Sequence, residues 1–402
     1  MRGVFMGAPL KRRIGLGLLT AYGVGVMVGA GIYVLVGAIA GDAGVWAPVS
    51  FLLAGLIAAP TALSYCEFST RLPEAAGEAA FVGTGLNSQA MAILVGLAIV
   101  AVGTVSAGAV LRGGVGYLIH AMEVPASAAT LVLGVTLTAI AVFGVLESLA
   151  VAAVFTVIEL TGLALVAWAG LMAAPSPSPD WTIGAPPHWM GIGFGAVLAF
   201  FAFIGFEDIV NMAEEVKHPE RTLPRAILLS LAITSVIYAL VCWAAVRAVP
   251  VSALSASGSP LALVWQTARG GSGEFLSAIA VFAALNGVLA QIVMASRVLF
   301  GLGKRSPTLA IFHRAHPRFG TPALATVLIG TAVIAAALFV PVATLAETTS
   351  AIILGVFVLV NLALILQKRK EPPARFMVPM AVPVVGLALS SIALLVAIGG
   401  MV

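Results

Sequence analysis

The chain has 402 residues, of which 61% are hydrophobic and only 9% are charged. Soluble domains carry about 25% charged residues, so this composition excludes a soluble enzyme and a disordered scaffold and indicates a membrane protein. The net charge of +4 fits the basic cytoplasmic loops of a membrane protein better than it fits nucleic-acid binding. Cys66 and Cys242 lie in separate apolar stretches and provide neither a disulfide framework nor a zinc module.

The chain contains eleven apolar runs that are long enough to cross a bilayer. A hydrocarbon core of about 30 Å takes roughly 20 residues of helix. The predicted spans are residues 14–40, 46–66, 88–118, 124–144, 151–173, 189–213, 225–248, 272–300, 322–341, 345–366 and 377–400. The first run has no small-residue cleavage site, so we expect it to remain as a span. The sequence predicts an all-α membrane protein with one transmembrane domain over residues 1–402.

The distribution of Lys and Arg predicts the orientation. With the N-terminus in the cytoplasm, every basic residue except Arg112, Arg247 and Arg269 falls in a segment assigned to the cytoplasmic side. The predicted protein therefore lies in the cell membrane with its N-terminus inside and its C-terminus outside. The longest connection, residues 174–188, is too short to fold alone, so functional residues are expected in the helices.

The first span carries glycines at mid-membrane depth. Gly25 and Gly29 have the spacing of close helix packing, which is one interpretation. The other is that Gly29, Ala30 and Gly31 unwind the helix and free backbone groups to line a polar cavity. A second interruption at Gly205, in the sixth span, favours the second interpretation.

Two interrupted helices indicate one shared site. Half-helix N-termini attract a carboxylate and half-helix C-termini attract a cation, so paired interruptions suit a zwitterion such as an amino acid. An inverted repeat of spans 1–5 (residues 14–173) on spans 6–10 (residues 189–366) would bring the interruptions together. Residues 377–400 would then form an additional helix.

Four segments resemble motifs of the amino acid–polyamine–organocation (APC) transporter superfamily, in order along most of the chain. They are Gly29-Ala30-Gly31-Ile32 (G-x-G-I), residues 65–78, residues 200–226, which are the most specific, and residues 295–322. The resemblance implies a LeuT-type fold, a 5+5 inverted repeat whose helices 1 and 6 are discontinuous. It also implies secondary active transport of amino acids or related amines, with no enzymatic activity.

The same resemblance implies a substrate site at the two interruptions. Backbone N–H groups of Gly29, Ala30, Gly31 and Ile32 would bind the substrate carboxylate. Carbonyl groups of Val26, Met27, Ala202, Phe203 and Ile204 would bind its ammonium group, next to Gly205. The expected partners are an amino acid, protons and the lipid bilayer, with no cofactor, metal or nucleic acid, and the chain is expected to be a monomer or weak dimer.

The sequence departs from the family pattern in three places. Members usually have twelve spans, whereas eleven are predicted here. The difference affects the expected dimer contacts and leaves the core ten spans unchanged. His218 stands where Asn is common. Glu159 stands where several proton-coupled relatives carry a lysine on the fifth span.

Glu159 and Glu207 are the acidic candidates inside the spans. Glu159 is either a structural glutamate bonded to Thr156 or a neighbouring helix, or a titrating group beside the first span. The centre of the eighth span, residues 278–290, offers no Ser or Thr hydroxyl for a sodium site, which favours proton-coupled symport with Glu159 as the coupling residue. Glu207 and Asp208 either face the cavity or cap the resumed half-helix, and Glu207 is assigned to the site.

Several functions remain open in the sequence. Phe203 and Tyr33 favour a small neutral amino acid, whereas an inward Glu207 favours a cationic side chain or a polyamine and hence an exchanger of the same fold. A channel is expected to show a polar pore or a repeated filter sequence. A membrane-embedded enzyme needs a nucleophile–base pair, which is missing here, and a sensor would bind an amino acid without carrying it.

Overall fold

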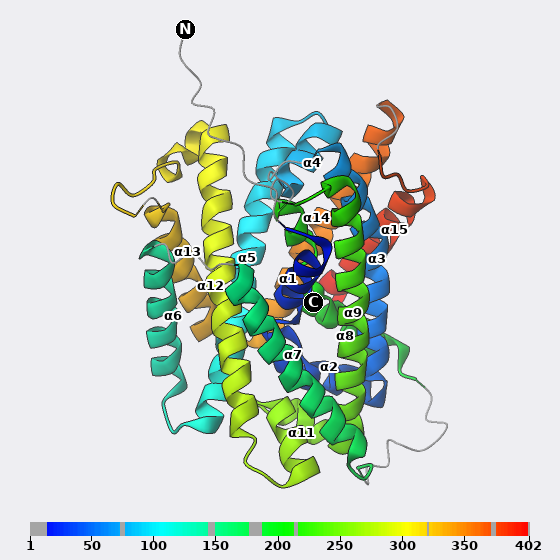
Figure 1. Ribbon diagram of the computed structural model, residues 1–402, viewed down its shortest axis with the longest axis vertical. Coiled ribbons are helices and arrows are strands. Elements are labelled where there is room, and N and C mark those ends of the chain that lie inside the picture. The colour runs from blue at the N-terminus through cyan, green and yellow to red at the C-terminus, as the bar shows by residue number, and fades with distance from the viewer. Residues whose placement is uncertain are drawn as a thin grey trace.

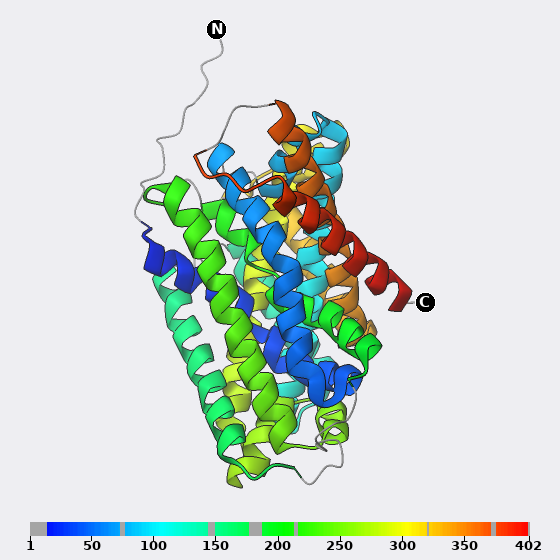
Figure 2. The same cartoon turned by 90° about the vertical axis from the view of Figure 1, so that its right-hand side faces the viewer.

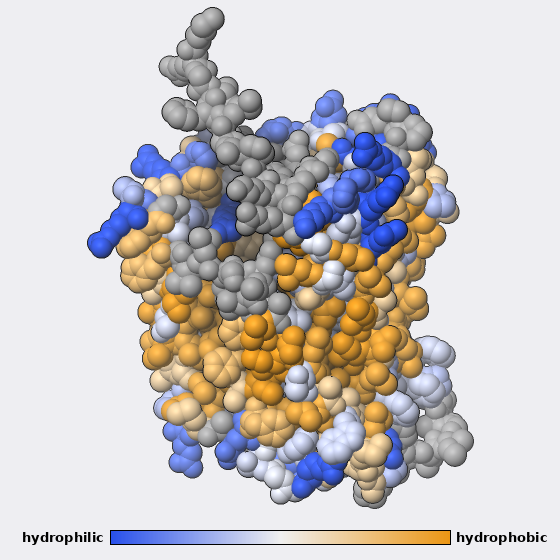
Figure 3. Space-filling view, viewed as in Figure 1, coloured by the Kyte–Doolittle hydropathy of each residue, from blue (hydrophilic) through white to orange (hydrophobic). Residues whose placement is uncertain are grey.

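The computed structural model describes residues 14–72, 77–143, 149–176, 187–212, 216–319, 321–370 and 375–400. Within these ranges the chain is helical apart from turns and one isolated bridge between Ile14 and Val216. Nine helices in the described part of the chain are long and apolar enough to cross a membrane. An apolar band separates two more hydrophilic ends of the molecule (Figure 3). The chain is therefore a multi-pass membrane protein, as predicted.

Helices cover every predicted span. They are α1 (Leu16–Val28), α2 (Ala30–Ala43), α3 (Ala47–Arg71), α5 (Gln89–Ala121), α6 (Ala126–Phe143), α7 (Leu149–Met172), α8 (Trp189–Phe200), α9 (Pro219–Ala248), α12 (Glu274–Arg305), α13 (Ala323–Phe339), α14 (Val342–Lys370) and α15 (Ala381–Gly400). Shorter helices are α4 (Gly77–Gly85), α10 (Val251–Ala256) and α11 (Pro260–Arg269). Because α2 and α3 join through a 3-10 turn, and because α1 and α13 are short, the count of eleven crossings stays a prediction.

Small residues allow the helices to pack closely where lipid gives no hydrophobic driving force. On α5, Gly114 faces Ala284 of α12, and Gly103 faces Ala295 of the same helix. Gly134 of α6 likewise lies against Ile334 of α13. The apolar helices are thus assembled by close backbone approach as well as by side-chain packing.

The interrupted helices α1 and α2 lie in the middle of the bundle, against α7, α8 and α9 (Figures 1 and 2). Gly29 alone separates α1 from α2. The interruption is therefore narrower than predicted, because Ala30 and Gly31 already belong to α2. The first half-helix ends and the second begins within one residue.

The second interruption follows α8. A 3-10 turn η3 (Phe201–Phe203) leads to an extended Ile204 and to Gly205, whose φ of +127° ends the helical path. A second 3-10 segment, η4 (Glu207–Met212), resumes the helix. Motif residues 73–76, 213–215 and 320, and the basic N-terminal residues 2–13, lie outside the described residues.

Candidate functional site

The two interruptions touch each other. A Cβ atom added to Gly31 would lie 3.1 Å from the Ala202 Cα atom, so α2 meets η3 at a glycine. A Cβ atom added to Gly205 would lie 2.6 Å from the Cγ1 atom of Val26 and 3.3 Å from the backbone nitrogen of Met27. With its positive φ, Gly205 is a position where only glycine fits without strain. The structure thus brings together the segments that the sequence analysis selected.

The contact places backbone groups of opposite polarity side by side. Val26 and Met27 lie in the last turn of α1, where carbonyl groups lack partners within the helix. The first turn of α2 contains Ala30, Gly31 and Ile32, whose N–H groups lack such partners. A half-helix C-terminus and a half-helix N-terminus therefore meet at Gly29, which is the charge pattern that a zwitterion needs.

Tyr238 of α9 joins the carbonyl groups of the two interruptions. Its hydroxyl group lies 2.5 Å from the Met27 oxygen and 2.8 Å from the Ala202 oxygen. The side chain is fully buried, and its ring packs against Phe51 and Phe203. Sequence reasoning missed this residue, although a tyrosine in the middle of an apolar span was a signal that could have found it.

Glu159 of α7 lies beside the first interruption. The Tyr33 hydroxyl on α2 donates a hydrogen bond to the backbone oxygen of Glu159 (2.9 Å), and Gly25 of α1 packs against the Thr156 hydroxyl, one turn earlier on α7. The Glu159 side chain is 2% exposed, and among the described residues its Oε2 atom has no hydrogen-bond partner. Glu159 therefore lies beside the first interruption, and its carboxyl group is buried.

Glu207 turns back onto its own backbone. Its Oε2 atom accepts a hydrogen bond from the Gly205 N–H group (2.9 Å), which lies in the second interruption and ahead of η4. The side chain is buried, so its charge is directed at the second interruption.

Glu78 of α4 adds a further buried carboxyl group near η4. Tyr65 donates a hydrogen bond to its Oε1 atom (3.4 Å). Burial raises the pKa of Glu78 from 4.5 to about 7, and the negative charge of Asp208 contributes to the rise. Sequence reasoning did not select Glu78, because Glu78 comes close to Asp208 of η4 only in the folded chain.

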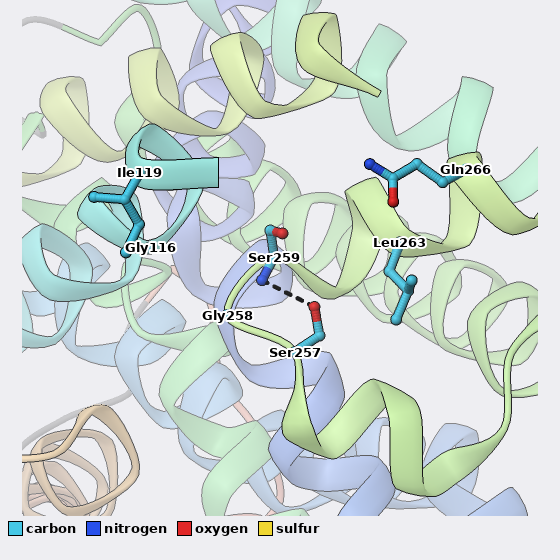
Figure 4. Close-up of a pocket in the computed structure, with 7 residues that line it drawn as sticks. All are labelled: Gly116, Ile119, Ser257, Gly258, Ser259, Leu263 and Gln266. Carbon is cyan, nitrogen blue, oxygen red and sulfur yellow. Dashed lines mark hydrogen bonds between the residues drawn. The ribbon is translucent and has the colours of Figure 1, made fainter. Parts of the chain in front are cut away.

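The opposite end of the bundle is closed over α2. The Tyr117 hydroxyl on α5 donates to the Tyr33 oxygen (2.6 Å) and accepts from the Leu261 N–H group of α11 (3.3 Å). Between α10 and α11, a loop beside the end of α5 borders a cavity of about 330 Å³ (Figure 4). Its lining consists of Gly116, Ile119, Ser257, Gly258, Ser259, Leu263 and Gln266. The cavity contains none of the predicted site residues and is separate from the interruptions.

In the part of the chain that the structure describes, no group of three His, Cys, Asp or Glu side chains could hold a metal ion. The candidate site consists of backbone dipoles and glycines, with the buried Glu159 and Glu207 beside them.

The sequence model of a family described as amino acid permease matches residues 14–401. The chain belongs to the amino acid permease family of the APC superfamily. This permease is 30% identical to the branched-chain amino acid permease BcaP of Bacillus subtilis, over 94% of the chain and 86% of that protein. It is 29% identical to the methylthioribose transporter of the same organism, over 88% of the chain and 81% of that protein.

A plant relative is similar over a smaller share of its length. The chain is 31% identical to the chloroplastic cationic amino acid transporter 9 of Arabidopsis thaliana, over 77% of the chain but only 58% of that protein. Family membership confirms the resemblance found in the motifs and makes the chain a transporter, not an enzyme.

Proposed function

We propose that this permease is a secondary active transporter that moves neutral aliphatic amino acids across the cell membrane by alternating access. The observation that carries the proposal is the contact between the two interruptions. Backbone N–H groups of Gly29, Ala30, Gly31 and Ile32 bind the substrate carboxylate. Carbonyl groups of Val26, Met27, Ala202, Phe203 and Ile204 bind its ammonium group, and Gly205 and Glu207 shape the same site.

The side chains at the site favour a neutral substrate. Phe203, Ile204 and Tyr33 surround the interruptions with buried apolar surface, which suits an aliphatic side chain. The Glu207 carboxyl group accepts from the Gly205 N–H group, so it is already engaged within the protein. The similarity to a branched-chain amino acid permease over most of both chains supports the same substrate class.

A cationic amino acid is the second candidate. Glu78, Glu207 and Asp208 lie within electrostatic reach of one another near η4, where a basic side chain would find compensating charge. The similarity to a cationic amino acid transporter supports this class, although over a smaller share of that protein. A binding screen with purified permease separates the two candidates. Leucine should give the larger thermal stabilisation if the substrate is neutral, and lysine should give the larger one if the substrate is cationic.

The proposed architecture has eleven spans, with the N-terminus in the cytoplasm. Residues 14–173 and 189–366 form the two inverted repeats, residues 377–400 form the additional helix, and the protein is a monomer or weak dimer. The ion pair of Glu67 with Lys368 joins α3 with α14, and the pair of Glu220 with Arg375 joins α9 with the segment before α15. These ends carry the basic residues assigned to the cytoplasm, which supports this orientation.

Protons are the proposed coupling ion, and Glu159 is the proposed coupling residue. A buried ionised carboxylate with an oxygen that lacks a hydrogen bond is costly, so the protonated side chain is the form that this conformation accommodates. When the bundle opens around α1, the same carboxyl group gains access to water and can release its proton. Coupling then requires only a change in exposure at Glu159.

Proteoliposomes test the coupling directly. Leucine uptake should follow an imposed pH gradient and not an imposed sodium gradient. Glu159→Gln should lose accumulation driven by the pH gradient while it retains exchange of labelled for unlabelled leucine, and Glu274→Gln, at an exposed position of α12, should behave as wild type. Uptake driven by sodium alone, or accumulation by Glu159→Gln, would assign the glutamate a structural role.

A further inference from the structure

We infer that Tyr238 positions the ammonium-binding carbonyl groups of the substrate site, and that its hydroxyl group thereby determines how strongly the permease prefers substrates that carry an amine. The inference rests on the proposed function and adds a specificity-determining residue to it. Its basis is that one hydroxyl oxygen lies within hydrogen-bond distance of a carbonyl from each interrupted helix.

The hydroxyl group fixes the spacing of two carbonyl oxygens that belong to different helices. Met27 lies at the end of α1, and Ala202 lies in η3. Both oxygens point at the same hydroxyl, so they can lie no farther apart than the two hydrogen bonds together allow. A primary ammonium group needs such a pair of converging acceptors, because its three N–H donors point in different directions.

The hydroxyl group leaves the carbonyl groups able to bind substrate. A tyrosine carries a single O–H donor, whereas each carbonyl oxygen has two lone pairs. The hydroxyl therefore cannot satisfy both oxygens fully, and acceptor capacity remains for an incoming ammonium group. The hydroxyl also reduces the repulsion between two half-helix C-termini that would otherwise face each other without a donor.

Packing holds the hydroxyl group in place. The Tyr238 ring lies 5.5 Å from the Phe51 ring and 5.3 Å from the Phe203 ring, measured between centroids, and the side chain has no exposed surface. Because the ring is packed on two sides, its hydroxyl oxygen has a fixed position, and this position determines where the two carbonyl groups lie. Removal of the oxygen alone would free the carbonyl groups without emptying the ring site.

A matched control lies one turn earlier on the same helix. Ser230, Thr234 and Tyr238 follow each other at four-residue spacing and share one face of α9. Ser230 donates to the Thr20 oxygen of α1 (3.1 Å), which shows that this face meets the first half-helix. The Thr234 hydroxyl is buried and, among the described residues, has no hydrogen-bond partner. Thr234→Val therefore removes a buried hydroxyl from the same face without releasing a carbonyl group.

The experiment deletes the hydroxyl group and the ligand's amine in combination. Uptake of labelled leucine is measured in wild-type permease, Tyr238→Phe and Thr234→Val, and three unlabelled ligands are tested as inhibitors. They are L-leucine, leucine methyl ester, which keeps the amine, and 4-methylpentanoate, which is leucine without its amine. Tyr238→Phe should weaken inhibition by the two amines about tenfold, as expected when a carbonyl group moves away and one charge-assisted hydrogen bond from the ammonium group is lost. It should change inhibition by 4-methylpentanoate less than about twofold. Thr234→Val should change none of the three.

The pattern across ligands separates positioning from general destabilisation. An equal loss for all three ligands, or no loss for any, would overturn the inference. If Tyr238→Phe does not fold, 3-fluorotyrosine at position 238 keeps ring and hydroxyl while changing the donor strength, and it must shift inhibition by leucine without shifting that by 4-methylpentanoate. A wild-type permease that binds no amino acid would refute the proposed function itself. If wild type binds leucine but Tyr238→Phe shows no selective loss of inhibition by the two amines, only the role of Tyr238 is refuted.

Discussion

Glu78 shows how a single buried carboxyl group responds to the fold. Its side chain is 5% exposed and lies near Asp208, and the two effects together raise its pKa from 4.5 to about 7. The folded protein therefore binds the Glu78 proton more tightly than the unfolded chain does. The stabilisation from this proton is fully present below about pH 4.5 and is lost as the pH rises through about 7.

Replacement of Glu78 by glutamine should remove this pH dependence. Glutamine keeps an oxygen that can accept from Tyr65 but carries no charge, so the variant should be more stable than wild type at pH 8 and equally stable at pH 4.5. The expected gain at pH 8 is a few kcal/mol, since one pKa unit corresponds to about 1.4 kcal/mol. Thermal unfolding in detergent at both pH values measures it, and a gain of the same size at both would contradict the argument.

Two arginines that fall outside the segments predicted to be cytoplasmic, Arg112 and Arg247, cap neighbouring helices. Arg112 donates from Nη1 to the Ala337 and Leu338 oxygens at the end of α13 (2.6 and 3.1 Å). Arg247 donates from Nη1 to carbonyl groups of residues 170, 171 and 173 at the end of α7. A guanidinium group satisfies helix C-terminal carbonyl groups and complements their partial negative charge, so these residues stabilise helix ends.

At the scale of the helix, each interruption depends on a glycine that allows close contact. Gly205 combines a positive φ with contact to Val26, and Gly31 lies against Ala202. Strain at a backbone conformation that L-residues rarely adopt costs about 1–3 kcal/mol, and a larger side chain would also separate the two interruptions. A larger side chain at Gly31 or Gly205 therefore acts directly on the contact between the two interruptions.

Gly205→Ala and Gly31→Val should strongly weaken substrate binding in a protein that still inserts and folds. The expected loss of leucine affinity is about tenfold or more, because the strain and the displaced backbone both act on the site. Thermal stabilisation of purified variants by leucine measures the loss. Gly193→Ala is the control on α8, where no atom lies within 4 Å of the added Cβ, and leucine shifts of wild-type size in Gly31→Val would refute the site.

At the scale of the whole molecule, a buried charge cluster connects three parts of the bundle. Glu67 of α3 binds Arg71 (2.7 Å) and, through Oε2, both Lys368 of α14 (2.6 Å) and the N–H group of Val378 (2.9 Å). Lys368 also donates to the Val378 oxygen (2.7 Å). One carboxylate thus joins α3, α14 and the segment that leads into α15, and all its charged partners are nearly buried.

Glu67→Gln should therefore destabilise the protein by about 3–5 kcal/mol, since it leaves Lys368 and Arg71 buried without a countercharge. The control is Glu220→Gln, which breaks the 3.6 Å pair with Arg375, a residue with a side chain that is 78% exposed. That change should cost at most about 1 kcal/mol. Thermal unfolding in detergent compares the two, and equal shifts would show that the Glu67 cluster does not join the bundle as described.

The composition and motif order by themselves determined that this is a multi-pass membrane protein of the amino acid permease family. Apolar runs of about 20 residues have few alternatives to helices in a bilayer, because every backbone group must be satisfied within the span. Gly29, Gly31 and Gly205 indicated where the spans are interrupted, because glycine in an apolar span is typical of either close packing or local unwinding. These are local properties of the chain, and a single sequence contains them.

Only the tertiary structure decided what each interruption meets. The contact of Gly31 with Ala202 and the convergence of two carbonyl groups on Tyr238 join residues through their relative placement in space. The burial of Glu78 and the Glu67 cluster depend likewise on partners far along the chain. Hydropathy and spacing describe each helix alone, whereas a hydrogen bond between helices depends on their rotation and depth, which packing sets.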